Sequence, residues 1–235
     1  MKGWAVTEWL WNLVYPDRCY ICGEVIPWRS GLCRACAEKA PRILPPVCSK
    51  CGRGEDRCSC RQRQMHFARC VSPFYYEDTV KTGILALKNT ACRPYVSGFA
   101  AEIAEVLRRE YGGIAFDRIT AVPLYRADER LRGFDPNALL AKQLARLTGI
   151  AYAPLLKKTV HTAPQKSLDA RLRSGNLLGA FDVTVPVQGM TILLIDDIIT
   201  TGATLDECAK MLKLAGAAEV YAATACADAF EAARK

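Results

Sequence analysis

The stretch Ile192-Leu-Leu-Ile-Asp-Asp-Ile-Ile-Thr-Thr-Gly-Ala-Thr204 places two adjacent carboxylates between an apolar run and a short threonine and glycine loop. The apolar run predicts a buried strand at residues 191–195, and the apolar positions after the loop predict a helix at residues 204–214. In open α/β sheets, ligands bind beyond the carboxyl ends of the strands. We therefore expect the two carboxylates to face a ligand at the edge of a sheet.

The loop after the carboxylates has the features of a phosphate site. Backbone N–H groups at a helix start, helped by threonine hydroxyls, bind anions, and Gly202 allows a close approach because it has no Cβ. Asp196 and Asp197 would repel a phosphate, so we expect them to face a neutral sugar. The predicted phosphate ligands are Thr200, Thr201, Gly202, Ala203 and Thr204. The sequence has no Gly-Lys-Ser/Thr loop, so a P-loop NTPase is not expected.

Strands and helices alternate along the chain from Val71 onward. Strands are predicted at residues 119–124, 179–183 and 220–225, and helices at residues 99–109 and 137–147. Apolar strands separated by helices indicate an α/β fold with a mainly parallel sheet flanked by helices on both faces. The polar, basic interval at residues 157–176 is long for a connection, and we interpret it as a lid.

Eight of the twelve cysteines fall within residues 19–60, in four close pairs. Pairs of this kind are typical of structural zinc sites, because two thiolates from one turn fill half a tetrahedron. Two Zn²⁺ sites are predicted, in either a sequential or a crossed arrangement of the pairs. Four thiolates per ion leave no position open for catalysis. The predicted ligands are Cys19, Cys22, Cys33, Cys36, Cys48, Cys51, Cys58 and Cys60.

The chain is predicted to have two parts, a zinc-stapled module at residues 1–70 and an α/β domain at residues 71–235. The formal net charge is +8; the first part carries most of the excess, and thiolates on zinc would cancel much of it. The charge is therefore weak evidence for nucleic acid binding. Residues 4–14 are apolar but too short to span a bilayer; they predict an amphipathic helix, packed on the protein or touching a membrane surface. Reduced cysteines without a secretory signal indicate a cytoplasmic protein.

The stretch from Ile192 to Thr204 resembles the signature with which type I phosphoribosyltransferases bind 5-phosphoribosyl 1-pyrophosphate (PRPP). The resemblance implies the type I phosphoribosyltransferase fold, with Asp196 and Asp197 on the ribose hydroxyls, partly through Mg²⁺ and water. It also implies that the segment Ala121-Val-Pro-Leu-Tyr-Arg126 is the pyrophosphate loop. Arg126 would lie nearest the diphosphate, with Arg132 following, and arginine suits that role through its bidentate geometry.

Several further segments together resemble the ComF-type family, which is associated with competence and DNA uptake. They include Leu87-Lys88, Arg132-Gly-Phe134, Thr162-Ala-Pro-Gln165, and Arg171 followed by Asn176. The resemblance adds Lys88, Gln165 and Arg171 to the expected pyrophosphate and lid residues. It implies single-stranded DNA and uptake machinery such as a helicase as partners. Asp135-Pro136 stands where the family usually has Asn-Gln, so no role is assigned to that position.

Three functions are consistent with these observations. The first is a Mg²⁺- and PRPP-dependent phosphoribosyltransferase, a glycosyltransferase of nucleoside metabolism, whose acceptor the sequence does not identify. The second is a non-enzymatic competence factor that binds single-stranded DNA or nucleotides, and the third is a PRPP sensor. No clear general base is visible, since Thr200 stands where purine phosphoribosyltransferases often carry an acid. Only the enzyme would release pyrophosphate.

Overall fold

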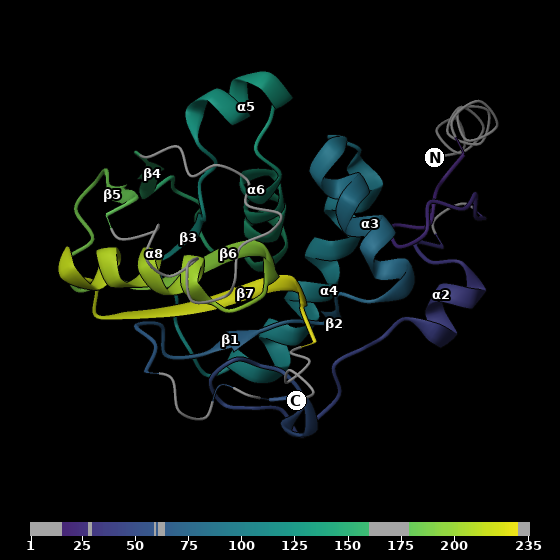
Figure 1. The fold of residues 1–235 in the computed structure, drawn as a ribbon, viewed down its shortest axis with the longest axis horizontal. Coiled ribbons are helices and arrows are strands. Elements are labelled where there is room, and N and C mark those ends of the chain that lie inside the picture. The colour runs from purple at the N-terminus through teal and green to yellow at the C-terminus, as the bar shows by residue number, and fades with distance from the viewer. Residues whose placement is uncertain (1–15, 28–29, 59, 61–63, 160–178, 230–235) are drawn as a thin grey trace, which may run out of the picture.

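A five-stranded parallel sheet forms the centre of the protein (Figure 1). The computed structural model describes residues 16–27, 30–58, 60, 64–159 and 179–229. The strand order is β1-β7-β6-β3, and β2 also pairs with β7, so the two longest strands lie in the middle of the sheet. The strands are β1 (Cys70–Val71), β2 (Phe74–Tyr75), β3 (Arg118–Ala121), β6 (Thr191–Ile199) and β7 (Glu219–Ala227).

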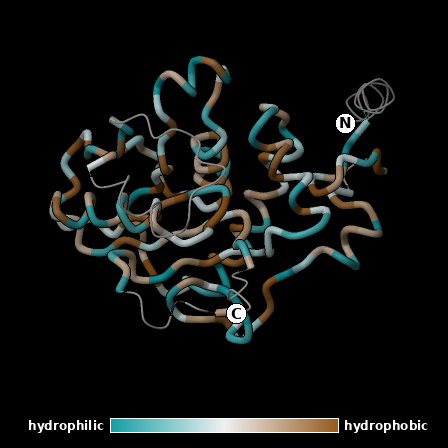
Figure 2. Tube along the Cα trace, viewed as in Figure 1, coloured by the Kyte–Doolittle hydropathy of each residue, from teal (hydrophilic) through white to brown (hydrophobic). Residues whose placement is uncertain are grey.

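Helices cover both faces of the sheet, as the alternating pattern predicts. On one face, α3 (Asp78–Asn89), α4 (Arg93–Tyr111) and α6 (Pro136–Thr148) share a core with Leu193 and Ile195 of β6. On the other face, α8 (Ala203–Leu214) and the antiparallel pair β4 (Leu156–Lys158) and β5 (Phe181–Val183) pack on Ile192 and Leu194. Figure 2 shows hydrophobic residues along the strands and the sides of the helices, with more hydrophilic residues in the loops.

Several boundaries differ from the sequence prediction. The strand predicted at residues 191–195 continues to Ile199, because β7 still offers backbone partners there, with Ile199 paired to Ala227. Asp196 and Asp197 therefore lie within β6 rather than after it. The strand predicted at residues 119–124 ends at Ala121. It is followed by a short helix that was not predicted, α5 (Arg126–Arg132), which has no buried residue and stands away from the sheet (Figure 1).

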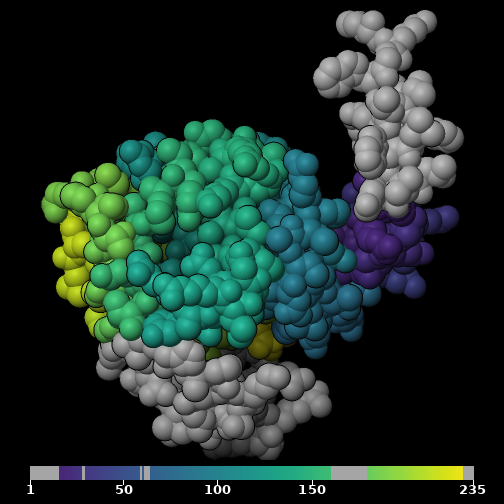
Figure 3. All heavy atoms as spheres, turned by 90° about the horizontal axis from the view of Figure 1, so that it is seen from above, coloured from purple at the N-terminus to yellow at the C-terminus, as the bar shows by residue number. Residues whose placement is uncertain are grey.

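The first cysteine region, which contains Cys19, Cys22, Cys33 and Cys36, packs directly on α3 and α4. Cys19, Tyr20 and Ile21 belong to the same hydrophobic core as Ile84 and Phe99. A Cβ added at Gly83 would lie 2.6 Å from the backbone oxygen of Tyr20, so the two backbones approach very closely. Figure 3 shows the purple residues of this region against the blue residues of α3. The first cysteine region and the sheet domain therefore share one hydrophobic core.

The linker between the two cysteine regions is also fastened to the domain. Arg42 forms an ion pair with Glu102 of α4, and the Tyr20 hydroxyl donates a hydrogen bond to the same carboxylate. The arginine also lies over the ring of Phe74, 4.8 Å from its centroid. The helix α2 (Arg34–Lys39) is the one α-helix described before α3.

Among the described residues, no helix is both long and apolar enough to cross a bilayer. The predicted amphipathic helix at residues 4–14 lies outside the described residues.

Candidate functional site

Asp196 and Asp197 form the centre of the candidate site. Both are buried, each only 9% exposed. The Nδ2 group of Asn137, in the first turn of α6, donates to Asp196 Oδ1 at 2.8 Å and to the carbonyl oxygen of Val122 at 3.2 Å. Lys88 Nζ, from α3, lies 3.1 Å from Asp197 Oδ2. Side chains from two helices on one face of the sheet therefore hold the two carboxylates in place.

The two carboxylates differ in their electrostatics. Burial, and then repulsion by Asp197, raises the pKa of Asp196 to about 8, although the hydrogen bond from Asn137 acts in the opposite direction. Burial opposes the charge of Lys88, but the nearby carboxylates outweigh it and raise the pKa of this lysine. Without a further cation, the pair therefore carries less than two full negative charges near neutral pH.

The site has the donors that a hard divalent cation requires. All ligand atoms offered by the two carboxylates are oxygens, which Mg²⁺ prefers. Asn137 Oδ1 is buried and finds no hydrogen-bond partner among the described residues. An unpaired buried acceptor is costly, and a metal-bound water or a ligand hydroxyl would satisfy it. The residues present therefore fit a magnesium ion with its water shell.

The loop after β6 has the shape expected of an anion site. Gly202 has a φ of 80°, in the left-handed region that favours glycine, and α8 begins at the next residue. The first bond of the helix runs from Asp206 N to Gly202 O, and the Thr201 hydroxyl accepts from Ala203 N at 3.3 Å. The first N–H groups of a helix have no partner within the helix. The loop is thus placed beside the carboxylates with donors available.

A side chain that sequence analysis missed supports this loop. Arg53 lies in the sequence between Cys51 and Cys58, two of the predicted zinc ligands, and is only 3% exposed. Its guanidinium donates to the carbonyl oxygens of Ile199, Thr200 and Asp228. Nothing in the sequence around Arg53 predicts this contact. Asn137 did leave a signal, because it occupies a position on the face of α6 that also carries Leu140, Ala141 and Leu144.

The predicted pyrophosphate loop starts next to Asp196. Val122 N donates to Ile195 O, so the residue after β3 lies beside the carboxylates. Arg126 and Arg132 stand at the two ends of α5, both exposed. The described residues provide no hydrogen-bond or ion-pair partner for either arginine, so the structure does not join them to the carboxylates. Asp135, where the family pattern is broken, caps α6 by accepting from Asn137 N and Ala138 N.

Only the base of the predicted lid is described. β4 and β5 are paired antiparallel, with Lys157 opposite Asp182. Burial lowers the pKa of Lys158, whose ammonium group lies 6.0 Å from the centroid of the Phe181 ring. Gln165 and Arg171 lie outside the described residues.

The eight cysteines form two separate groups in the sequential arrangement. The sulfur atoms of Cys19, Cys22, Cys33 and Cys36, and those of Cys48, Cys51, Cys58 and Cys60, each lie within 4.8 Å of one another. Tetrahedral Zn–S geometry places sulfurs about 3.8 Å apart, and the structure has Cys22 and Cys33 at 3.7 Å and Cys48 and Cys60 at 3.5 Å. None of the twelve cysteines forms a disulfide. Both groups fit a structural zinc ion, and the crossed arrangement is ruled out.

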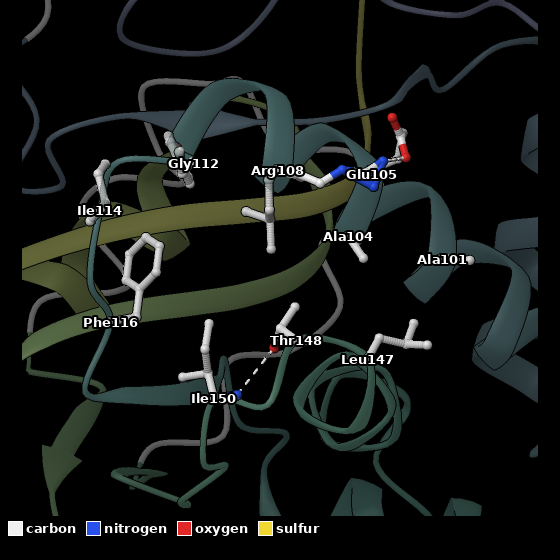
Figure 4. A pocket seen from close by; sticks show the side chains of 12 residues that line it. Ala101, Ala104, Glu105, Arg108, Gly112, Ile114, Phe116, Leu147, Thr148 and Ile150 are labelled. Atoms are coloured by element: carbon white, nitrogen blue, oxygen red, sulfur yellow. Dashed lines mark hydrogen bonds and ion pairs between the residues drawn. The ribbon is translucent and has the colours of Figure 1, made fainter.

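Two cavities lie away from this site. One, of about 460 Å³, is lined by apolar side chains of α4, α6 and the segment that leads into β3 (Figure 4). Ala104, Phe116 and Ile150 line it, and the Arg108–Glu105 ion pair lies at its edge. It is at the amino end of β3, opposite the carboxylates. The other lies between the first cysteine region and the start of α4. Neither contains a predicted PRPP, pyrophosphate or magnesium residue.

Comparison with curated proteins assigns the family. The chain is 34% identical over 220 residues to the DNA utilization protein YhgH of Salmonella typhi, covering 88% of this chain and 96% of the relative. The chain belongs to the ComF-type family. Other members include competence protein F of Haemophilus influenzae, 28% identical with 86% and 93% covered, and competence protein ComFC of Bacillus subtilis, 26% identical with 83% and 88% covered.

Two domain models match this ComF-type chain. The double zinc ribbon domain matches residues 10–71, and the phosphoribosyl transferase domain matches residues 132–235. Together with the parallel sheet, they show a type I phosphoribosyltransferase-like fold preceded by a double zinc ribbon, as predicted.

The chain also resembles solved structures of proteins whose names refer to PRPP or to a nucleobase. Adenine phosphoribosyltransferase of Saccharomyces cerevisiae is 15% identical, with a TM-score of 0.40 and 65% and 75% of the two chains covered. Glutamine PRPP amidotransferase of B. subtilis is 22% identical, with a TM-score of 0.39, and 59% of this chain aligns with 30% of that one. The chain thus spans about a third of the length of the amidotransferase. The fold assignment rests on the domain model and the sheet, not on these superpositions.

Proposed function

We propose that this protein binds Mg²⁺ and PRPP at Asp196, Asp197 and the loop at residues 200–204, and transfers the phosphoribosyl group to an acceptor not yet identified. One observation carries the proposal. Two adjacent buried carboxylates, held by Lys88 and Asn137, lie in the last four residues of β6, which is followed by a glycine loop and a helix start. This order of groups suits a sugar diol followed by a phosphate.

The residues of the chain would divide the work as follows. Asp196 and Asp197 bind the ribose hydroxyls and the waters of Mg²⁺, and Lys88 holds Asp197 in position. Thr200, Thr201, Gly202, Ala203 and Thr204 bind the 5′-phosphate. Mg²⁺ supplies charge that stabilises a departing pyrophosphate. Arg126, Arg132, Gln165 and Arg171 are assigned to the pyrophosphate and the lid.

A second candidate follows from the names of the relatives, which refer to DNA utilization and competence rather than to a nucleobase. In this reading the domain binds PRPP or nucleotide phosphates as a sensor, or binds single-stranded DNA, without turnover. Arg126, Arg130 and Arg132 on the exposed α5 offer charge for a phosphate backbone. Pyrophosphate release from PRPP in the presence of bases, nucleotides and single-stranded DNA separates the enzyme from both non-enzymatic functions.

The binding proposal is tested by calorimetry with PRPP and Mg²⁺ on the wild type and on the Asp196→Asn/Asp197→Asn double variant. Each lost charged hydrogen bond is worth about 1.5–3 kcal/mol, so the affinity should fall by roughly tenfold or more per bond. Asp182→Asn is the matched control, because Asp182 is a half-exposed carboxylate of β5 that pairs with Lys157. Equal binding by wild type and double variant, or no binding by either, contradicts the proposal.

A further inference from the structure

The side chain of Arg53 links the second zinc ribbon to the end of the central sheet. Arg53 Nε donates to Asp228 O at 2.7 Å, just after β7. Its Nη2 donates to Ile199 O at 2.9 Å, the last residue of β6, and to Thr200 O at 2.6 Å. One buried guanidinium therefore ties together the carboxyl ends of the two central strands and the first residue of the candidate phosphate loop. Arginine suits this task because its planar fork of donors is rigid.

The backbone around Arg53 is fixed by the zinc knuckle. Cys48 N donates to the backbone oxygen of Arg53, and Gly52 N donates to Cys48 O, which closes the turn on the metal ligands. The same turn lies against β1. A Cβ added at Gly52 would be 2.4 Å from Cys70 O, and Cys70 N donates to Lys50 O. The position of Arg53 is therefore set on one side by the cysteine group and on the other by the sheet edge.

The chain that follows the same cysteine group borders the loop from a second direction. A Cβ built at Gly202 would lie 3.4 Å from Met65 Cε and 3.8 Å from Phe67 Cζ. His66 N donates to the Asp206 carboxylate in the first turn of α8, and its ring Nδ1 lies 3.2 Å from the same oxygen. This contact engages the acidic side chain in the first turn of α8, which would otherwise oppose an anion.

We propose that the second zinc site is part of the ligand-binding machinery, with Arg53 as the positioning residue for the phosphate loop. Cys48, Cys51, Cys58 and Cys60 surround Arg53 in the sequence, and the segment at residues 65–67 begins five residues after Cys60. A zinc ion on these thiolates would hold both supports of the loop in register. The inference rests on the proposed phosphate site and adds a role for the zinc ribbon beyond folding. The positive charge of Arg53 next to Thr200 also favours an anion there.

The first experiment compares the wild type with Arg53→Met in two measurements. Calorimetry gives the affinity for PRPP with Mg²⁺, and hydrogen–deuterium exchange without ligand gives the protection of the amides at residues 199–204. We expect the dissociation constant to rise about tenfold or more, in line with the loss of residues that orient direct ligands. Exchange at residues 199–204 should accelerate, while exchange in α4 and the zinc content stay unchanged.

Three further variants complete the design. Lys50→Met is the matched control, since Lys50 is an exposed cation of the same knuckle, and both measurements should match the wild type. Arg53→Lys keeps the charge but cannot reach three carbonyls with one fork, so intermediate values are expected. If Arg53→Met loses the protection of α4, that variant is unfolded. The loop exchange of Arg53→Lys then tests the role of Arg53 in its place. Cys60→Ser should accelerate exchange at residues 199–204 as Arg53→Met does.

The outcomes separate this inference from the proposed function. A wild type that does not bind PRPP refutes the proposed site, and loop exchange then decides the role of Arg53 by itself. Wild-type loop protection and wild-type affinity in Arg53→Met overturn the inference while leaving the PRPP proposal intact. Wild-type loop protection in Arg53→Lys, where Arg53→Met is unfolded, overturns it as well.

Discussion

Replacing Asp196 by Asn should stabilise the ligand-free protein at alkaline pH and leave its stability unchanged in acid. The pKa of Asp196 rises from 3.8 to about 8 in the fold. Between these values the folded state binds more protons than the unfolded chain, so the free energy of unfolding falls as pH rises from about 4 to about 8. Asparagine keeps the size of the side chain and the oxygen that accepts from Asn137, and it does not ionise.

The size of the stabilisation follows from the pKa shift of Asp196. Each pKa unit is worth about 1.4 kcal/mol, so a shift of about four units sets an upper limit near 6 kcal/mol on the stability gained at pH 8 or above. Because the charge of Asp196 interacts with the neighbouring Asp197 and Lys88, we expect a gain of about 2–4 kcal/mol at pH 8.5 and about 1 kcal/mol or less at pH 4.5. Urea unfolding in magnesium-free buffer at several pH values measures both quantities.

Asp197→Asn is the informative partner variant, because it should have the opposite effect. It removes the carboxylate that lies 3.1 Å from Lys88 Nζ and leaves a largely buried ammonium without its nearest partner. A loss of about 1–2 kcal/mol is expected near neutral pH, smaller than for a fully buried pair because Lys88 is partly exposed. Parallel stability–pH curves for wild type and Asp196→Asn would refute the reasoning.

Three further predictions concern the rest of the molecule. Elemental analysis should find two zinc ions per chain. Cys33→Ser should reduce the zinc content to one ion and destabilise the protein, since zinc binding supplies folding free energy. A native protein that contains no metal would contradict this prediction. Gly98→Ala should cost about 1–3 kcal/mol in urea unfolding, because its Cβ would lie 2.1 Å from the Tyr20 ring, whereas Gly113→Ala, with nothing within 4 Å, should cost no more than a few tenths. Binding of single-stranded DNA, if direct, should weaken with salt at a slope of about 0.7 per phosphate contacted, and absence of binding at low salt would assign the DNA role to a partner protein.

Sequence alone was sufficient for the parts of the site that are continuous along the chain. The apolar run, the carboxylates, the glycine and the helix start follow each other within residues 192–204, so local pattern fixes their order and their place at the sheet edge. The spacing of the cysteines likewise predicted two groups of four. The end of β6 was misjudged because it depends on β7, whose pairing with Ile198 and Ile199 has no local signal.

The residues that were missed reach the site from distant segments. Arg53 is far from Thr200 in sequence, and its contacts are with backbone oxygens, which leave no pattern in side-chain identity. Asn137 was taken only as the first residue of the helix predicted at residues 137–147, although a polar residue on an otherwise apolar helix face indicates a buried polar group with a role. α5 has no buried residue, so hydrophobic periodicity, the main signal for helices, was absent there.

The pairing of β1 and β2 with β7 has a consequence for how the protein is made. Cys70 pairs with Ala222 and Phe74 with Cys226, so the ribosome completes the partner strand long after the first two strands have emerged. At about 5–20 residues per second, the delay is on the order of ten seconds. During that interval both cysteine groups are already synthesised and can take up metal, while Arg53 has neither Ile199 nor Asp228 to bind. The nascent chain therefore exposes an unfinished sheet edge beside a finished zinc knuckle, and this is where a chaperone would be needed.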